Sequence, residues 1–328
     1  MTERLFLEDI GRSHSISAIG DARLWSIHNL FNDPTLPPLI YVMESAVGQQ
    51  FLLGRHVSGR PKFNMVRYIA KSIVGLFFEH LSRKDCCQYL ILRDAYPFDL
   101  QFAFGCAPPY DIRILPTAFI KLERVPSPDG TDLDVKGQEM IGEYRGETWL
   151  IPDLKIGSGS TIAFFLKNAF ARHVPREVHL FTTCGSLEGI RRIHKECRKA
   201  GVELIPVFTQ CIFELSKNGN LPGLPFPNLS VMNPGSITTR EFYEKAMTRY
   251  QGARMCSVGD VNASLDDPLQ YSIQTLWEWE ALKMDPQKEN WDDWTIDIRG
   301  ENARNKIREF RPALFDYFKS ILGEEPGG

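Results

Sequence analysis

One short stretch carries the residue types that bind an anion at the start of a helix. An apolar, strand-like run reaches Asp153, and a helical pattern begins at Ile162. Between them lies a loop of small residues, Gly157, Ser158, Gly159, Ser160 and Thr161. Glycines let a backbone approach a ligand, and hydroxyl groups donate hydrogen bonds at low steric cost. Because the first amides of a helix are unpaired and lie at the positive end of its dipole, the sequence predicts a phosphate site at 157–161.

Two common phosphate-binding motifs are excluded in this loop. The P-loop requires a lysine directly before the final serine or threonine, and no lysine precedes Ser160 or Thr161. The dinucleotide fingerprint requires a glycine where this chain has Ile162. A different kind of phosphate loop, with Asp153 four residues ahead of the first glycine, remains.

The elements around the loop alternate between strand and helix. Strand patterns and helical patterns follow one another at 148–154, 162–173, 176–185, 186–201 and 202–211. Alternation at this spacing predicts βαβ units and a parallel sheet. Ser186 is the expected N-cap of the second helix, and Gly201 is its expected C-cap.

The flanking regions give a coarser prediction. Apolar residues at three- and four-residue steps predict a helix over 63–81, and apolar runs after residues 88 and 110 open as strands. Residues 126–148 are polar and rich in turn formers, which is typical of a functional lid or a disordered loop. Helical patterns from residue 238 onward predict a helical C-terminal extension.

Composition excludes several classes of protein. Of the 328 residues 43% are hydrophobic and 24% charged, which is typical of a globular protein, and a net charge of -3 gives no global field for nucleic acid. The seven cysteines form no C-x-x-C pair, so reduced thiols in a cytoplasmic protein are expected. The N-terminus has no apolar core of a secretory signal, and no apolar run has the length of a membrane helix. Ordinary structural roles are expected for four residues, His173, His179, His194 and Cys184.

Residues 153–161 resemble the phosphoribosyl pyrophosphate loop of the type I phosphoribosyltransferases, in which an acidic residue precedes a turn reading A-T-G-G-[ST]. The uracil phosphoribosyltransferases are the most similar branch, because they keep the first acid, here Asp153, and replace the second, here Leu154. The resemblance implies that Lys155 and residues 157–161 hold the 5-phosphate, while Asp153 accepts hydrogen bonds from ribose hydroxyls.

Other segments resemble the same family in the same order. Ile91–Ala95 is similar to the I-L-R-A-G turn that grips pyrophosphate, with Arg93 on the arginine position and Asp94 and Ala95 in place of A-G. Ile120–Arg124 resembles the segment before the flexible hood, so that Arg124 becomes the hood arginine. Residues 183–190 are similar to the segment around A-P-E-G-I in the uracil branch, and residues 53–63 weakly resemble the lead-in to the first long helix.

The resemblance implies an α/β fold, a type I phosphoribosyltransferase-like parallel sheet flanked by helices, at 45–237. A hood at 120–148, an N-terminal segment at 1–44 and a helical extension at 238–328 complete the expected organisation. The implied reaction moves ribose 5-phosphate from phosphoribosyl pyrophosphate to an acceptor and releases pyrophosphate. Arg93, Arg124 and Asp153 are the implied catalytic residues. A homodimer is expected, with Mg²⁺ chelated mainly by the substrate and no protein metal site.

The expected acceptor segment departs from the uracil branch. Uracil enzymes carry P-G-L-G-D-A-G-D after their last core strand, whereas this chain has P-G-L-P-F-P-N at 222–228. Prolines lack the N–H group that such a reader uses, so an aromatic or heterocyclic acceptor other than uracil is expected. The expected acceptor-binding residues are Leu221, Gly223, Leu224, Phe226 and Asn228.

Two alternatives remain open from the sequence. The altered turn at Asp94–Ala95 and the lost uracil reader also suit a non-catalytic sensor of phosphoribosyl pyrophosphate or a nucleotide. The long aromatic tail also suits a helical assembly module with a vestigial site. No basic arm supports a nucleic-acid-binding regulator.

Overall fold

The computed structural model describes residues 8–9, 22–53, 59–92, 95, 98–105, 115–126, 133–215 and 244. The chain divides into two compact units, one of Met1–Leu53 with Asn64–Gly259 and one of Gly54–Phe63 with Asp260–Gly328. Nearly all described residues belong to the first unit. Apart from Glu244, the predicted extension at 238–328 lies outside the described residues, as does the predicted acceptor segment.

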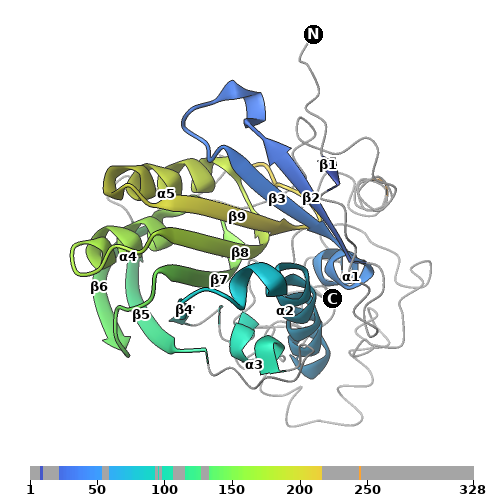
Figure 1. Cartoon of the computed structure of the whole chain (residues 1–328), viewed down its shortest axis with the longest axis horizontal. Helices are drawn as coiled ribbons and strands as arrows, with labels where there is room; N and C mark the ends of the chain where they lie inside the picture. Colours follow the sequence, from blue (N-terminus) through green and yellow to red (C-terminus); the bar gives the residue numbers. More distant parts are fainter. Residues whose placement is uncertain are drawn as a thin grey trace, which may run out of the picture. The chain divides into compact units, whose positions relative to one another are not determined.

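Within the residues that the structure describes, a nine-stranded sheet forms the centre of the first unit (Figure 1). Its strands are β1 (Glu8–Asp9), β2 (Arg23–His28), β3 (Leu39–Glu44), β4 (Cys86–Leu92), β5 (Thr117–Pro126), β6 (Leu133–Ile141), β7 (Thr148–Ile156), β8 (Glu177–Gly185) and β9 (Glu203–Thr209). The helices are the 3-10 turn η1 (Leu30–Asn32), α1 (Ala46–Leu53), α2 (Gly59–Leu81), α3 (Leu100–Gly105), α4 (Ser160–Phe170) and α5 (Leu187–Ala200).

The strand order is β1-β2-β3-β9-β8-β7-β4-β5-β6. Strands β3, β9, β8, β7, β4 and β5 run parallel, and antiparallel strands β2 and β6 flank them. The predicted α/β fold, a parallel sheet flanked by helices, is confirmed. The six strands from β6 to β9 have the doubly wound order 3-2-1-4-5-6 when they are numbered along the chain from β4. In this order successive strands are added on one side of the first strand and then, from the fourth strand on, on its other side. Here those two strands are β4 and β7.

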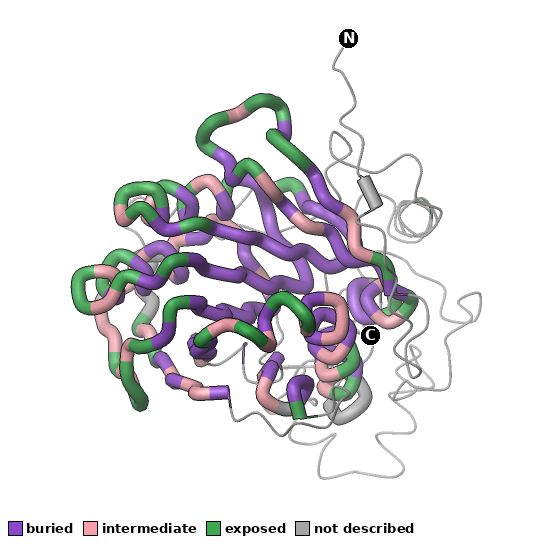
Figure 2. The backbone as a smooth tube through the Cα atoms, in the orientation of Figure 1, coloured by how far each residue is buried: buried purple, intermediate pink, exposed green. Residues whose placement is uncertain are grey.

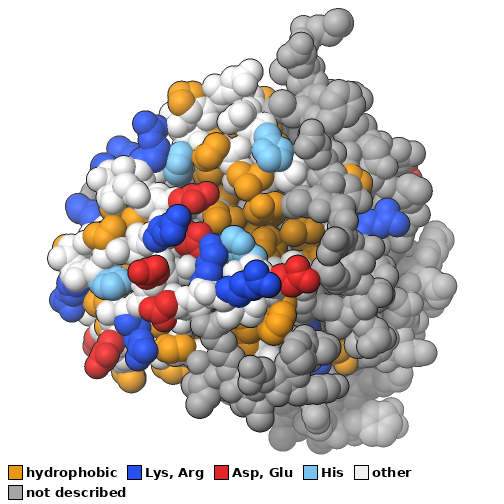
Figure 3. Space-filling view, in the orientation of Figure 1, with side chains coloured by type: hydrophobic (Ala, Val, Ile, Leu, Met, Phe, Trp, Pro, Cys, Tyr) orange, Lys and Arg blue, Asp and Glu red, His pale blue; other side chains and the backbone are white. Residues whose placement is uncertain are grey.

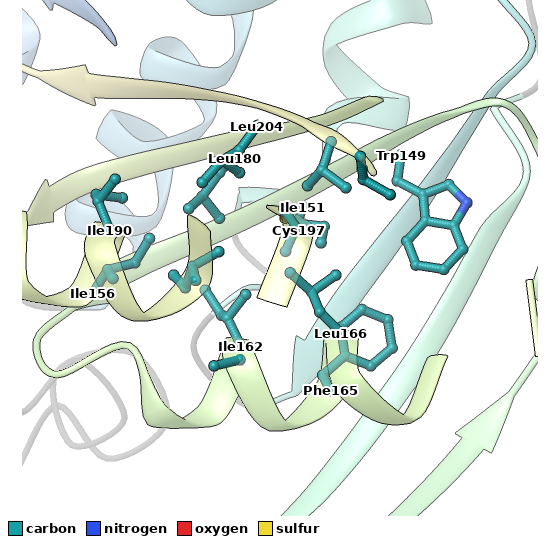
Figure 4. Close-up of a cluster of buried hydrophobic side chains, with 14 of the residues drawn as sticks. Trp149, Ile151, Ile156, Ile162, Phe165, Leu166, Leu180, Ile190, Cys197 and Leu204 are labelled. Carbon is teal, nitrogen blue, oxygen red and sulfur yellow. The ribbon is translucent and has the colours of Figure 1, made fainter. Parts of the chain in front are cut away.

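Apolar side chains fix helices to both faces of the sheet. On one face, residues of α4 and α5 pack on β7, β8 and β9, and the fully buried Trp149 lies at one end of this cluster (Figure 4). The Trp149 ring lies 4.5 Å from that of Tyr89, and its Nε1 donates to Arg145 O at 2.9 Å. On the other face, Phe77 of α2 makes edge contacts with Tyr41 and Phe181. The central strands are therefore buried along most of their length (Figure 2).

Both predicted caps of α5 are confirmed. Ser186 Oγ accepts the backbone N–H of Gly189 at 2.9 Å, and Gly201 has the left-handed φ of 70° that favours glycine. The side chain of Cys184 is fully buried, as expected for a packing role. His173 and His194 contact backbone oxygens, those of Gly146 and Thr35, each at 2.9 Å.

The prediction for residues 126–148 is partly wrong. Residues 133–141 form strand β6, which pairs antiparallel with β5 in a hairpin. The sequence concealed this strand because five of its nine residues are polar or glycine, and it contains no long apolar run.

A buried ionic network lies at the amino edge of the sheet, remote from the loop at 157–161. Glu177 Oε1 accepts hydrogen bonds from Lys84 Nζ, from Thr148 Oγ1 at 2.9 Å and from His179 Nε2 at 3.1 Å. Burial by itself raises the pKa of Glu177, but the hydrogen bonds from His179 and Lys84 outweigh burial and hold this pKa well below its usual range. The network thus keeps a charged carboxylate inside the fold.

The described surface carries charges of both signs. Basic and acidic side chains are interspersed on the face shown in Figure 3 and form no large patch of one sign. None of the helices in the described ranges combines the length and the apolar character that a membrane span requires.

Candidate functional site

The strand order reverses between β4 and β7, and the hydrogen bonding between these two parallel strands is incomplete. In the described part of the sheet, these strands pair only from Cys86 to Gln88 against Thr148 to Leu150. Toward its carboxyl end, β7 keeps pairing with β8 but has no pairing with β4. Pro152, which lacks an N–H group, lies in this singly paired part of the strand. In doubly wound sheets, ligands bind outside the carboxyl ends of the strands at this point of reversal.

The predicted phosphate loop follows β7 at this position. Helix α4 begins at Ser160, and its N-cap is Gly159, whose φ is 71° and which provides no side-chain cap. The amides of the first helical turn therefore keep their donor capacity, at the positive end of the helix dipole. Gly157, Ser158, Ser160 and Thr161 are partly exposed, while Gly159 is buried. The arrangement has the elements of an anion-binding helix start.

Helix α5 fixes the shape of this loop. Ser186 Oγ donates to Gly157 O at 2.7 Å and accepts from Gly189 N, so one hydroxyl joins the loop to the next helix. A Cβ on Gly159 would lie 2.4 Å from Gly189 O, and a Cβ on Gly189 would lie 2.4 Å from Gly157 O. The two glycines thus permit backbone-to-backbone contact. Gly159 serves this contact, whereas the sequence had suggested close approach to a ligand.

Asp153 lies on the part of β7 that is not paired with β4. Its side chain is 9% exposed, and Asp153 Oδ1 accepts the backbone N–H of Lys155 at 3.3 Å. Its neighbour in register on β8 is Thr182, whose hydroxyl donates to Cys184 O at 2.8 Å. A carboxylate is therefore held close to the carboxyl end of β7, a few residues before the loop.

The hairpin of β5 and β6 extends past the end of β4. Strand β5 pairs with β4 only up to Lys121, and residues 122–126 pair only with β6. The register between β5 and β6 shifts at Glu123/Arg124, which marks a bulge that changes the direction of a strand. This places the backbone of Arg124 beyond the carboxyl end of β4, on the side of the sheet where β4 and β7 separate.

The structure brings together only part of the predicted site. Asp153, Lys155 and the loop at 157–161 form one continuous group, and Ala95, fully buried, follows β4. Arg93 and Asp94 lie outside the described residues, as does the side chain of Arg124. All five predicted acceptor-binding residues also lie outside them: Leu221, Gly223, Leu224, Phe226 and Asn228.

Sequence reasoning missed two contributors to the site. Ser186 was identified as a helix cap, but its contact with Gly157 also holds the phosphate loop. Gly189 was not singled out, although its close contact with Gly159 requires a glycine at both positions. A glycine inside the first turn of a helix is the signal that would have pointed to it, because glycine is disfavoured there without a packing reason.

Among the residues with described positions, metal-ligating side chains do not gather at the loop. Within the described ranges, the one group of three such residues is His80, Glu177 and His179, at the amino edge of the sheet. There the Glu177 carboxylate is already paired with Lys84. The loop therefore offers backbone amides, hydroxyl groups and one carboxylate, which suit a phosphorylated, polyhydroxylated ligand.

The structure is therefore an α/β protein with a doubly wound sheet, and its predicted phosphate loop lies where β4 and β7 separate. No protein-family model matches the chain, and no curated protein matches it. Among solved structures it is similar to protein AQ2163 from Aquifex aeolicus, with 14% identity, a TM-score of 0.43 and coverage of 60% of this chain and 99% of that one.

Two further similar structures are phosphoribosyltransferases. The adenine enzyme from Trypanosoma brucei, in complex with AMP, pyrophosphate and ribose-5-phosphate, has 12% identity and a TM-score of 0.33, covering 52% of this chain and 83% of that one. The hypoxanthine enzyme from Staphylococcus aureus has 14% identity and a TM-score of 0.30, covering 37% and 63%.

Proposed function

We propose that the protein is a phosphoribosyltransferase that moves ribose 5-phosphate from phosphoribosyl pyrophosphate to an aromatic or heterocyclic acceptor and releases pyrophosphate. One observation carries the proposal. A loop with uncapped helix amides follows a strand that bears the buried Asp153, where the two central strands separate. Phosphate binding at a helix start and a carboxylate for sugar hydroxyls are the two contacts that a ribose 5-phosphate needs.

The proposed roles follow the chemistry of the displacement. Positive charge develops on the sugar and negative charge on the leaving pyrophosphate, so the site contributes mainly by positioning and by electrostatic stabilisation. The loop at 157–161 holds the 5-phosphate, and Asp153 orients the ribose through its hydroxyls. Arg93 and Arg124 stabilise the pyrophosphate charge. The hairpin of β5 and β6 acts as the hood that excludes water from the sugar cation.

The remaining requirements are part of the same proposal. Mg²⁺ is held mainly by the oxygens of the pyrophosphate and by water, which fits a loop whose described residues offer a single carboxylate. The protein acts in the cytoplasm as a homodimer. The segment at 221–228 closes over the acceptor, and its prolines provide an apolar wall with few donors, so uracil is expected to be a poor substrate.

Exchanging Asp153 for asparagine tests the proposed ribose contact. Asp153→Asn removes the charge while keeping the size of the side chain, and a hydrogen bond to a charged group contributes about 1–3 kcal/mol. The dissociation constant for phosphoribosyl pyrophosphate, measured by calorimetry with Mg²⁺ present, should rise roughly 5- to 150-fold.

A matched control separates this contact from a general loss of negative charge. Glu188→Gln removes a half-exposed carboxylate from the first turn of α5, where its contact with Arg191 is 3.8 Å long. The control should leave the affinity within about twofold, as expected for an exposed pair. If Asp153→Asn folds with unchanged thermal stability and binds the ligand as tightly as the control, Asp153 does not hold the ribose.

A further inference from the structure

A group of buried polar atoms lies at the carboxyl end of β9, next to the start of α1. In the described part of the chain, Thr209 Oγ1, Gln210 Nε2 and Gln49 Nε2 are buried and have no hydrogen-bond partner within the protein. The side chains of Thr209 and Gln210 are both fully buried. Buried polar atoms are paired in nearly all native structures, because an unpaired one loses its hydrogen bonds to water without replacement. Two of them, Thr209 Oγ1 and Gln210 Nε2, belong to consecutive residues at the end of β9, and such a pair indicates a binding function.

The contacts around α1 bring these residues together. Gln210 Oε1 accepts the backbone N–H of Ser45 at 2.6 Å, which fixes the orientation of the amide and leaves Nε2 as the unused donor. A Cβ on Gly48 would lie 2.6 Å from Thr209 Cγ2 and 3.0 Å from Gln210 Oε1. The first turn of α1 therefore packs directly on the end of β9, with Gln49 in the same turn.

The backbone at Gln210 adopts a conformation that is costly for its residue type. Its φ is 69°, a left-handed value that brings the Cβ of a non-glycine residue too close to the backbone. The backbone N–H of Gln210 donates to Met43 O at 2.7 Å, which holds this conformation in place. Strained positions that the surrounding structure maintains are concentrated at ligand sites.

The electrostatics of the group suit an anionic oxygen ligand. Both amide nitrogens are donors, and the threonine hydroxyl can donate as well. The positive end of the α1 dipole adds to them. Glu44, a buried carboxylate next to Ser45, lies on the opposite face of β3 from Thr209, because Met43 is in register with Thr209 and successive side chains alternate.

We propose that Gln49, Thr209 and Gln210 bind a carboxylate of the acceptor, so that the substrate is an aromatic or heterocyclic carboxylic acid. The inference rests on the proposed function, since it assigns the specificity of that site. Strand β9 lies two strands from β7, or about 10 Å, a distance that a ribose and one aromatic ring span together. A phosphoribosyl group on the loop would thus leave the far side of the acceptor near these donors.

Calorimetry with paired probes tests the proposal on the full chain. The probes are pyridine-3-carboxylate and 2-aminobenzoate, each compared with its amide, and ribose 5-phosphate is present to occupy the loop. We expect at least one acid to bind about tenfold more tightly than its amide. The NH₂ group of the amide is itself a donor, so it cannot accept hydrogen bonds from the donors of Thr209 and Gln210. Equal binding of acids and amides, or no binding by either acid, overturns the proposal.

Thr209→Val separates a ligand role from a structural role. Valine keeps the shape and removes a hydroxyl that has no partner in the protein, so the melting temperature without ligand should stay the same or rise. The affinity for the acid should fall about five- to twentyfold. Gln210→Glu is the second variant. It keeps an oxygen that accepts the Ser45 N–H but replaces the unused donor with an acceptor, so the affinity for the acid should fall by a similar factor.

The outcomes distinguish the two proposals. Unchanged affinity for the acid in both variants means that a bound water alone pairs these atoms, which overturns the inference. Acid binding that depends on Thr209, in a protein that does not bind phosphoribosyl pyrophosphate, would sustain the carboxylate site and reject the proposed function.

Discussion

Replacing Gly159 with alanine should lower the free energy of unfolding by about 2–5 kcal/mol. A left-handed φ costs a non-glycine residue about 1–2 kcal/mol, and overpacking a close contact adds about 1–3 kcal/mol. At Gly159 the φ is 71°, and the new Cβ would lie 2.4 Å from Gly189 O, a backbone atom that cannot rotate away. Urea denaturation of the full chain, followed by tryptophan fluorescence, measures the change. The phosphate loop should lose its shape as well, so ribose 5-phosphate should bind at least tenfold more weakly.

Gly201→Ala is the matched control for this prediction. Gly201 has nearly the same φ, 70°, but a Cβ there would meet no atom within 4 Å. The control therefore carries the backbone cost alone, about 1–2 kcal/mol, and should leave binding at the loop unchanged. If the two variants are equally stable and bind ribose 5-phosphate equally, the contact between Gly159 and Gly189 does not shape the site.

Replacing Glu177 with glutamine should destabilise the protein by about 3–5 kcal/mol at pH 7, the usual cost of removing one partner of a buried ion pair. The side chain of Glu177 is 7% exposed, and Lys84 and His179 would lose their charged partner. The pKa of Glu177 is lowered in the folded state, so its stabilising effect is full above the unfolded value of 4.5 and is lost as the pH falls below it. The difference between wild type and Glu177→Gln should therefore shrink on acidification through that value.

An exposed ion pair supplies the control for the network. Glu139→Gln breaks a contact of 3.2 Å with Lys121 in which both side chains are mostly exposed, so the change in unfolding free energy should stay below about 1 kcal/mol. Denaturation curves recorded from pH 3 to pH 8 compare the variants. A wild-type advantage over Glu177→Gln that remains constant across this range would show that Glu177 is not a charged partner in the fold.

Local patterns predicted the core of the fold well because each element carries its own signal. The alternation of apolar strands with helical faces predicted β7 to β9 with α4 and α5, and the caps Ser186 and Gly201 were evident from residue type. Strand β6 was missed because an edge strand needs no apolar run. The position of the loop between β7 and α4 was predictable because small residues separate an apolar run from a helical pattern there, while its binding role stays a prediction.

Features that depend on tertiary contacts could not be predicted from the sequence. The separation of β4 from β7 results from the order of strands in the sheet, to which Pro152 gives only an indirect clue. The contact between Gly159 and Gly189 joins residues 30 positions apart in the chain, and the group around Gln210 joins residues 45–49 to the end of β9. No local pattern marks a buried donor that lacks a partner, because that property depends on what surrounds it.

Mass spectrometry of the products tests the central proposal most directly. The full chain is incubated with phosphoribosyl pyrophosphate, Mg²⁺ and a panel of acceptors that includes uracil, heterocyclic bases and aromatic carboxylic acids, with Asp153→Asn as the parallel control. We expect one acceptor other than uracil to gain a ribose 5-phosphate group with release of pyrophosphate. The wild-type protein should convert uracil much more slowly than this acceptor, and Asp153→Asn should convert the acceptor much more slowly than the wild type. Phosphoribosyl pyrophosphate that remains unchanged with every acceptor in the panel would contradict the proposed transferase activity.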